Sequence, residues 1–107
     1  MTNIEQTNKK YPIITLCGST KFKDDFFEAQ KRLTLEGYIV ISVGLFGHSG
    51  DDLEGKKEML DDMHKRKIDL ADEIFVINKG GYIGSSTKSE IAYAIEQGKK
   101  ISYLEEV

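Results

Sequence analysis

Short apolar runs alternate with amphipathic stretches along most of the chain. Four runs, each four to six residues long, are apolar on both faces and partly β-branched, which is typical of strands in a covered parallel sheet. These runs are residues 13–17, 38–43, 74–77 and, more weakly, 101–104. Between them, apolar positions recur every three or four residues, which predicts helices. The helical stretches are residues 22–33, 60–71 and 91–98.

This alternation predicts an α/β fold, a small Rossmann/flavodoxin-like three-layer sandwich with a parallel sheet of about four to five strands. Residues 11–107 are expected to form a single domain, because a chain of 107 residues has the size of one compact core. Residues 1–10 are polar and predict a flexible N-terminal tail. Gly37 follows the first helical pattern, where a glycine commonly ends a helix.

Three loops that follow the first three strands are rich in glycine and hydroxyl side chains. They are residues 18–20, 44–55 and 78–87. Right-handed crossovers bring the carboxyl ends of parallel strands to one edge of the sheet, which is where open α/β sheets bind ligands. The three loops therefore predict one site for a small phosphorylated or sugar-bearing ligand.

Charge and composition narrow the class of partner. The net charge of −3 gives no basic surface for a nucleic-acid polymer, and the apolar runs are far shorter than the roughly 20 residues that span a membrane. A single cysteine, Cys17, together with the absence of a signal peptide, predicts a cytoplasmic protein. The cysteine and the two histidines lack the spacing of a zinc site, so we expect no metal and no cofactor.

The loop after the first strand has the composition of an anion site. Gly18, Ser19 and Thr20 lie where a strand passes into a helix, so backbone N–H groups, the helix dipole and two hydroxyls favour a negative charge there. A simpler interpretation is that Ser19 or Thr20 is a helix N-cap and Gly18 makes the turn.

A second loop of this kind precedes the third helix. The loop consists of Gly84, Ser85, Ser86 and Thr87: the glycine permits close backbone approach, and the two serines can hold phosphate oxygens. The chain contains neither a P-loop motif nor a glycine-rich dinucleotide motif after the first strand.

Glu90 is the main candidate for catalysis. It is expected in the first turn of the third helix at the ligand edge, where a carboxylate can act as a nucleophile towards a sugar carbon. However, Thr87 and Glu90 also match a capping box, in which Glu90 only bonds back to the Thr87 backbone. The pattern alone leaves both interpretations open.

His64 is the second candidate, because it lies in an apolar stripe between Leu60 and Ile68. An inward-facing imidazole either titrates near neutrality as an acid/base group or is a hydrogen-bonded core histidine. Among the nearby carboxylates, Asp61 is a rival for the acid/base role, whereas Asp72 precedes the third strand and equally fits a turn cap.

Aromatic and imidazole side chains occupy the two longer loops. Phe46, His48 and Tyr82 are placed either to stack on a planar base or to anchor these loops to the core. Phe46 and Tyr82 are therefore candidates for substrate binding.

Several of these motifs resemble the nucleoside 2-deoxyribosyltransferase superfamily, including its 2′-deoxynucleoside 5′-phosphate N-hydrolase branch. The resemblance covers roughly residues 12–104. It is carried by Leu16-Cys17-Gly18-Ser19-Thr20, by Ala71-Asp72-Glu73-Ile74, and most specifically by Gly84-Ser85-Ser86-Thr87-Lys88-Ser89-Glu90-Ile91-Ala92-Tyr93-Ala94 followed by Gly98-Lys99.

The resemblance implies an enzyme that cleaves or transfers at the N-glycosidic bond of a (deoxy)nucleoside 5′-monophosphate. Glu90 would attack the anomeric carbon, and Gly84, Ser85 and Ser86 would hold the 5′-phosphate. The turn that contains Cys17, Gly18 and Ser19 would lie beside the sugar and base. Family members are commonly homo-oligomers, so a homodimer or higher homo-oligomer is expected. The alternative function is a non-catalytic module that binds a nucleotide or a nucleotide-derived signal at the same edge.

Two departures from the family pattern affect the expected chemistry. Where the family usually carries an aspartate that protonates the leaving base, the alignment puts His64, with Asp61 as a rival one turn away. The acidic residues that transferases carry before the glutamate motif are replaced by Gly84 and Ser85, which favours a phosphorylated substrate over a free nucleoside.

Overall fold

Four parallel strands in the order β2-β1-β3-β4 form the central sheet of the computed structural model, which describes residues 10–47, 50 and 53–107. The strands are β1 (Ile13–Gly18), β2 (Ile39–Ile41), β3 (Glu73–Ile77) and β4 (Lys100–Tyr103). The fold is therefore of the small Rossmann/flavodoxin-like α/β class, as the alternating pattern predicts. The predicted tail, residues 1–10, lies outside the described residues except for its last position.

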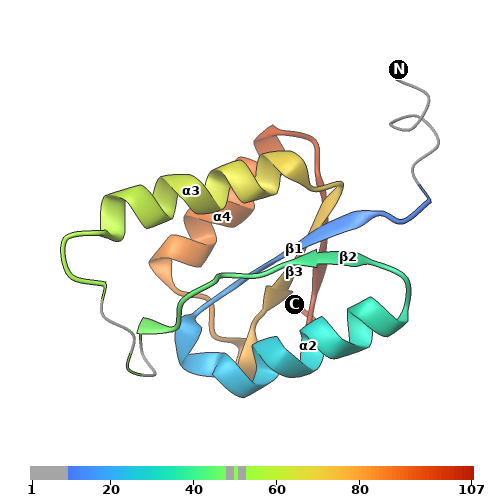
Figure 1. The fold of residues 1–107 in the computed structure, drawn as a ribbon, viewed down its shortest axis with the longest axis horizontal. Helices are drawn as coiled ribbons and strands as arrows, with labels where there is room; N and C mark the ends of the chain where they lie inside the picture. Colours follow the sequence, from blue (N-terminus) through green and yellow to red (C-terminus); the bar gives the residue numbers. More distant parts are fainter. Residues whose placement is uncertain (1–9, 48–49, 51–52) are drawn as a thin grey trace.

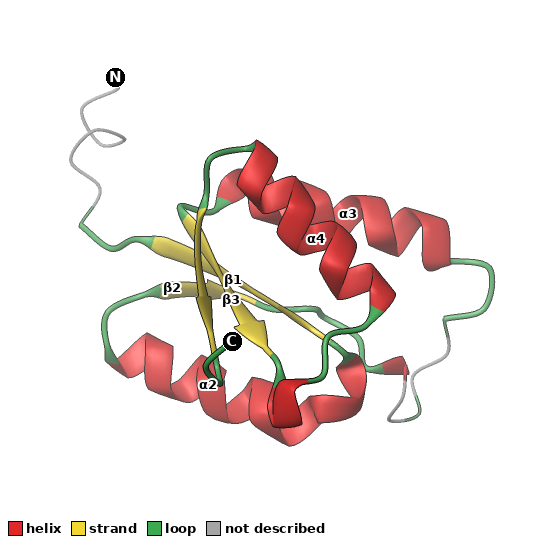
Figure 2. Cartoon of the chain, turned by 180° about the vertical axis from the view of Figure 1, so that it is seen from behind, coloured by secondary structure: helices red, strands yellow, loops and turns green. Residues whose placement is uncertain are grey.

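The helices cover both faces of the sheet. Helix α2 (Lys23–Leu35) packs on one face, and α3 (Lys57–Leu70) and α4 (Ser85–Glu96) lie together on the other (Figures 1 and 2). Two short 3₁₀ helices, η1 (Thr20–Phe22) and η3 (Lys79–Gly81), follow β1 and β3. No helix in the described ranges is long and apolar enough to cross a membrane.

Strand β1 supplies side chains to both halves of the core. Ile14 and Leu16 pack on the α2 side with Phe26, whereas Cys17 belongs to the cluster on the α3 and α4 side with Ile68. This division follows from the two-residue period of a strand, which sends successive side chains to opposite faces. Both faces of β1 are buried, which explains its continuous apolar run.

The predicted strand and helix segments are all present, with differences at their ends. Strand β2 is confined to residues 39–41, shorter than the apolar run at 38–43. Helix α4 begins at Ser85, earlier than its apolar stripe indicates. Gly37 ends α2 as predicted: its φ is +102°, and the N–H of Tyr38 donates to the carbonyl of Leu33 at 3.0 Å.

The two ends of β1 are held in different ways. At the amino end, the Ile13 N–H donates to Asp72 Oδ2 at 2.7 Å, and the Asp72 N–H donates to the Ile13 carbonyl at 2.8 Å. At the carboxyl end, Gly18 lies against Ile77 of β3, where an added Cβ would come within 2.8 Å of the Ile77 carbonyl oxygen. Only a glycine fits at this point, with its φ of +151°.

Candidate active site

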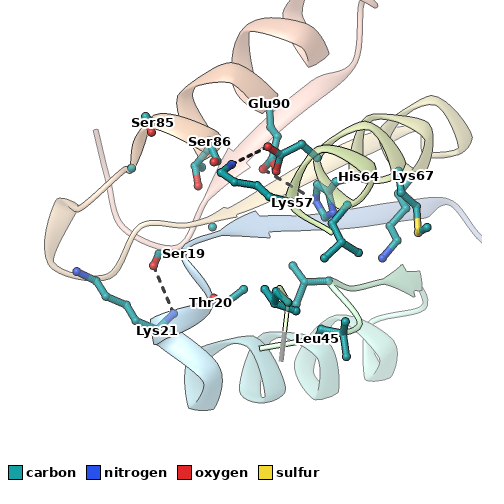
Figure 3. Close-up of a pocket in the computed structure, with 18 of the residues that line it drawn as sticks. Ser19, Thr20, Lys21, Leu45, Lys57, His64, Lys67, Ser85, Ser86 and Glu90 are labelled. Atoms are coloured by element: carbon teal, nitrogen blue, oxygen red, sulfur yellow. Dashed lines mark hydrogen bonds and ion pairs between the residues drawn. The ribbon is translucent and has the colours of Figure 1, made fainter. Parts of the chain in front are cut away.

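A cavity of about 610 Å³ opens at the carboxyl edge of the sheet, where the loops after the first three strands meet (Figure 3). This is the edge at which the sequence predicts a site. The predicted site residues that line it are Gly18, Ser19, Thr20, His64, Tyr82, Gly84, Ser85, Ser86, Thr87 and Glu90. Two predicted residues, Cys17 and Phe46, are not among the lining residues.

The start of α4 decides how Glu90 is used. The helix begins at Ser85 with Gly84 as its N-cap residue, and no side chain caps it. Thr87 therefore lies inside the first turn, buried at 3% exposure, and Glu90 lies in the second turn. The capping-box interpretation and the first-turn placement of Glu90 are both wrong, because the box requires Thr87 to precede the helix. Glu90 is left available to the cavity.

The carboxyl group of Glu90 is largely removed from water. Its side chain is 13% exposed, and burial raises its pKa to about 7, with the charge of Asp61 acting in the same direction. A hydrogen bond from the Cys17 thiol opposes this shift. Near neutral pH the group is therefore divided between its carboxylate and its acid form, which suits a residue that must change charge.

Cys17 lies behind the cavity wall rather than in it. It is fully buried on β1, and burial together with the charge of Glu90 raises the pKa of the thiol well above its ordinary value. The group therefore stays protonated, and the S–H donates to the Glu90 carboxyl group. Cys17 contacts a site residue and not the cavity, so it is placed to tune Glu90 rather than to touch a ligand.

His64 lies on α3 between Glu90 and β1. Its Nε2 is 3.0 Å from the carbonyl oxygen of Leu16, 3.5 Å from Cys17 Sγ and 4.0 Å from Glu90 Oε1. Burial lowers its pKa to about 4, helped by the charge of Lys67, so the imidazole is neutral near pH 7. Because a carbonyl oxygen can only accept, Nε2 carries the proton.

The Cys17, His64 and Glu90 side chains place their ligand atoms within 4.8 Å of one another, the separation of a three-residue metal site. A metal needs the lone pair of the imidazole nitrogen, however, and the Nε2 proton is held by the Leu16 carbonyl. The geometry therefore describes a hydrogen-bonded cluster around Glu90 better than a metal centre.

Backbone donors gather on the side of Glu90 opposite to Cys17 and His64. The hydrogen-bond ladder of α4 begins with the Lys88 N–H, which donates to the Gly84 carbonyl at 2.9 Å, so the N–H groups of Ser85, Ser86 and Thr87 precede it. Ser19 lies across the cavity mouth, where its Oγ accepts from the Lys21 N–H at 3.3 Å (Figure 3). The N-cap interpretation of Ser19 thus describes its local role, while its hydroxyl proton remains available.

The two aromatic candidates have different positions. Tyr82 lines the cavity, half-exposed, with its ring edge-on to Phe22 at 6.0 Å and under the Lys21 ammonium at 3.7 Å. Phe46 is 8% exposed and packs against Phe26 at 5.6 Å between ring centroids, so it anchors its loop to α2. The structure thus supports the anchoring interpretation for Phe46. His48, the third candidate, lies outside the described residues.

Sequence reasoning missed much of the cavity wall. The missed residues are three lysines and five apolar side chains, namely Lys21, Lys57, Lys67, Val43, Leu45, Leu53, Leu60 and Met63. The lysines resemble the solvated charges that surround them in the sequence. A usable signal existed on α3, because Lys57, His64 and Lys67 recur on the same helical face at multiples of about 3.5 residues.

Comparison with known proteins does not assign this chain to a family. Neither a protein-family model nor a curated protein matches this chain. The nucleoside 2-deoxyribosyltransferase resemblance therefore stays a prediction from the sequence motifs.

Proposed function

We propose that this protein cleaves or transfers at the N-glycosidic bond of a (deoxy)nucleoside 5′-monophosphate, with Glu90 as the nucleophile. The observation that carries the proposal is the Glu90 carboxyl group itself. It borders the cavity, is released from any capping role, and has a pKa of about 7 through burial. A carboxylate in that state is only weakly solvated and therefore reactive towards an anomeric carbon.

The distribution of polar groups supports a nucleotide as the ligand. Ser85, Ser86 and the first turn of α4 offer N–H and hydroxyl donors to a phosphate at one end, and Lys21 adds a positive charge nearby. The opposite end is lined by Leu45, Met63 and other apolar side chains that suit a planar base. Glu90 lies between these ends (Figure 3), at the level where the sugar would bind.

The proposed reaction has two steps. The ionised Glu90 carboxylate attacks C1′, and the C1′–N bond breaks with its electron pair leaving on the base, which takes up one proton. Water then attacks C1′ of the glycosyl ester, loses a proton and releases the Glu90 carboxylate together with the sugar phosphate. A second base in place of water completes transfer instead of hydrolysis.

Asp61 is better placed than His64 to protonate the departing base. Its carboxyl group borders the cavity and is half-exposed, so it can exchange protons with solvent, and the Lys57 ammonium lies 2.7 Å away. His64 is neutral near pH 7, and its Nε2 proton is already donated to a backbone carbonyl. We therefore assign His64 a positioning role and Asp61 the acid role.

The test is release of free base from matched deoxyribo- and ribonucleosides and their 5′-monophosphates, followed by chromatography. We expect release from monophosphates, none from the free nucleosides under the same conditions, and loss of release in Glu90→Gln. Glu96→Gln is the matched control, because Glu96 is an exposed acid on the same helix outside the cavity. Absence of release from every substrate at high enzyme concentration would favour the non-catalytic nucleotide-binding module.

Two further parts of the proposal rest on the sequence alone. A cytoplasmic location is proposed because a single cysteine is typical of proteins from a reducing compartment. A homo-oligomeric state follows from the family resemblance, and sedimentation of the purified protein would test it.

A further inference from the structure

Lys67 is held rigidly at the end of the cavity that faces away from the α4 N-terminus (Figure 3). Its backbone carbonyl accepts from Thr15 Oγ1 at 2.9 Å, which ties this turn of α3 to the sheet. Its ammonium donates to the Ser42 carbonyl oxygen at 2.8 Å, just past the end of β2. Both ends of the residue are therefore fixed before any ligand binds, which limits the entropy lost when a ligand binds there.

Within the part of the chain that the structure describes, no carboxylate balances the charge of Lys67. Among residues 10–47, 50 and 53–107, no acidic side chain lies within ion-pair distance of its ammonium, whereas Lys57 in the same cavity has Asp61 at 2.7 Å. The cavity lining around this end is apolar and includes Val43, Leu45 and Met63. Partial burial lowers the pKa of Lys67 from its ordinary value.

An ammonium has three donors and no acceptor, and one donor is used by Ser42. A ligand group that meets the other donors must therefore be an acceptor. If C1′ is at Glu90 and the phosphate is at Ser85 and Ser86, the edge of the base farthest from the glycosidic bond points towards Lys67. In nucleobases that distal edge carries either a carbonyl oxygen, which accepts, or an exocyclic amino group, which donates.

We propose that Lys67 is a specificity-determining residue that selects 6-oxopurine and 4-oxopyrimidine nucleotides over their 6-amino and 4-amino counterparts. This inference rests on the proposed function for the position of the base. An amino group facing the ammonium would leave the lysine donors unpaired in an apolar environment. The free-energy cost of such unpaired polar groups is what lets a polar site reject the wrong ligand.

Binding titrations of Glu90→Gln separate this proposal from catalysis. The probes are two matched pairs of 5′-monophosphates, deoxyinosine with deoxyadenosine and deoxyuridine with deoxycytidine, measured by calorimetry. We expect the oxo member of each pair to bind at least about tenfold more tightly, roughly the effect of one well-placed hydrogen bond. This result needs no change at Lys67, so it does not depend on how a variant folds.

Two lysine variants then test the residue itself in the Glu90→Gln background, each checked by thermal melting. Lys67→Met should bring the members of each pair to within about threefold, and Lys67→Arg should keep the preference. Lys21→Met is the matched control at the phosphate end, and it should weaken all four nucleotides by the same factor.

The outcomes distinguish the two proposals. Binding without an oxo preference, or a preference that survives in Lys67→Met, overturns the role of Lys67 and leaves the proposed function standing. Failure of every monophosphate to bind overturns the proposed function, and the specificity proposal falls with it.

Discussion

The two ends of strand β1 differ in how they use their polar groups. At the amino end, Ile13 and Asp72 exchange two hydrogen bonds, one through the Asp72 carboxylate and one through its backbone N–H. At the carboxyl end, Cys17 and Gly18 adjoin a cavity whose wall holds the buried carboxyl group of Glu90. At the amino end the polar groups are paired by hydrogen bonds, whereas at the carboxyl end an ionisable carboxyl group is kept away from water.

This difference separates stability from chemistry along a single strand. The Asp72 pair holds β1 and β3 together and does not line the candidate site, so its contribution is to folding. Glu90 has the opposite effect near neutral pH, because its pKa is higher in the folded state than in an unfolded chain. Its stabilising contribution is complete below its ordinary pKa of 4.5 and is lost as pH rises through about 7. Variants at the two ends should therefore change different measurements.

The largest effect is expected from Glu90→Gln. Loss of the nucleophile should lower base release by at least about 1,000-fold, while removal of a buried charge raises the free energy of unfolding by about 3 kcal/mol at pH 8. Chemical denaturation at several pH values checks the second part. The stability difference between variant and wild type should shrink as pH falls towards 4.5, and a constant difference would contradict the assigned pKa.

The next largest effect is the pH dependence of the wild-type reaction. Because attack requires the carboxylate, kcat/KM for base release should rise with pH to a midpoint near 7, by about 20-fold between pH 5.5 and 7.5. Initial rates at low substrate concentration give this profile. A rate that is flat over that range would show that ionisation of Glu90 does not control the reaction.

A smaller effect, a loss of stability without a loss of base release, is expected at the amino end of β1. Asp72→Ala removes the acceptor of the Ile13 N–H and should lower the free energy of unfolding by about 1 kcal/mol, since this bond is exposed to water. Base release by the folded variant should be unchanged, because Asp72 is remote from the cavity wall. A fall in kcat/KM without a fall in stability would show that the two ends are coupled.

The smallest effect should come from Cys17→Ala. The thiol hydrogen bond lowers the pKa of Glu90, so its loss should move the midpoint of the pH–rate profile upward by a fraction of a pH unit. Cys17→Ser keeps a hydroxyl donor and should leave the midpoint at or below its original value. A midpoint that is the same in both variants would mean that the contact has no influence on Glu90.

The pattern of apolar residues was sufficient to predict the sheet and its helices, because runs such as that around Ile14 and Leu16 are buried on both faces. It was not sufficient at the start of α4. Thr87 and Glu90 satisfy the local rule for a capping box, and only the packing of Thr87 inside the helix shows that the helix starts earlier. Local sequence rules give the positions at which a helix can begin, whereas tertiary packing decides at which of them it does begin.

The candidate site was also only partly predictable from the sequence. Convergence of the loops and the choice of Glu90 followed from the order of strands and the residue types. The neutral state of His64 and the lowered pKa of Lys67 did not, because both depend on burial by segments distant in the sequence. The role of Phe46 was ambiguous for a similar reason. An aromatic residue in a glycine-rich loop has the same sequence context whether its side chain contacts a ligand or packs in the core.

The neutral imidazole of His64 also provides a spectroscopic reporter. The chain has two histidines, so substitution of His48 is enough to assign the ring signals of His64 in a proton NMR spectrum. Its pKa of about 4 means that the ring itself does not titrate around pH 7. Any movement of those signals near neutrality therefore reports the charge on Glu90, 4.0 Å away, and gives the ionisation of the proposed nucleophile without a substrate.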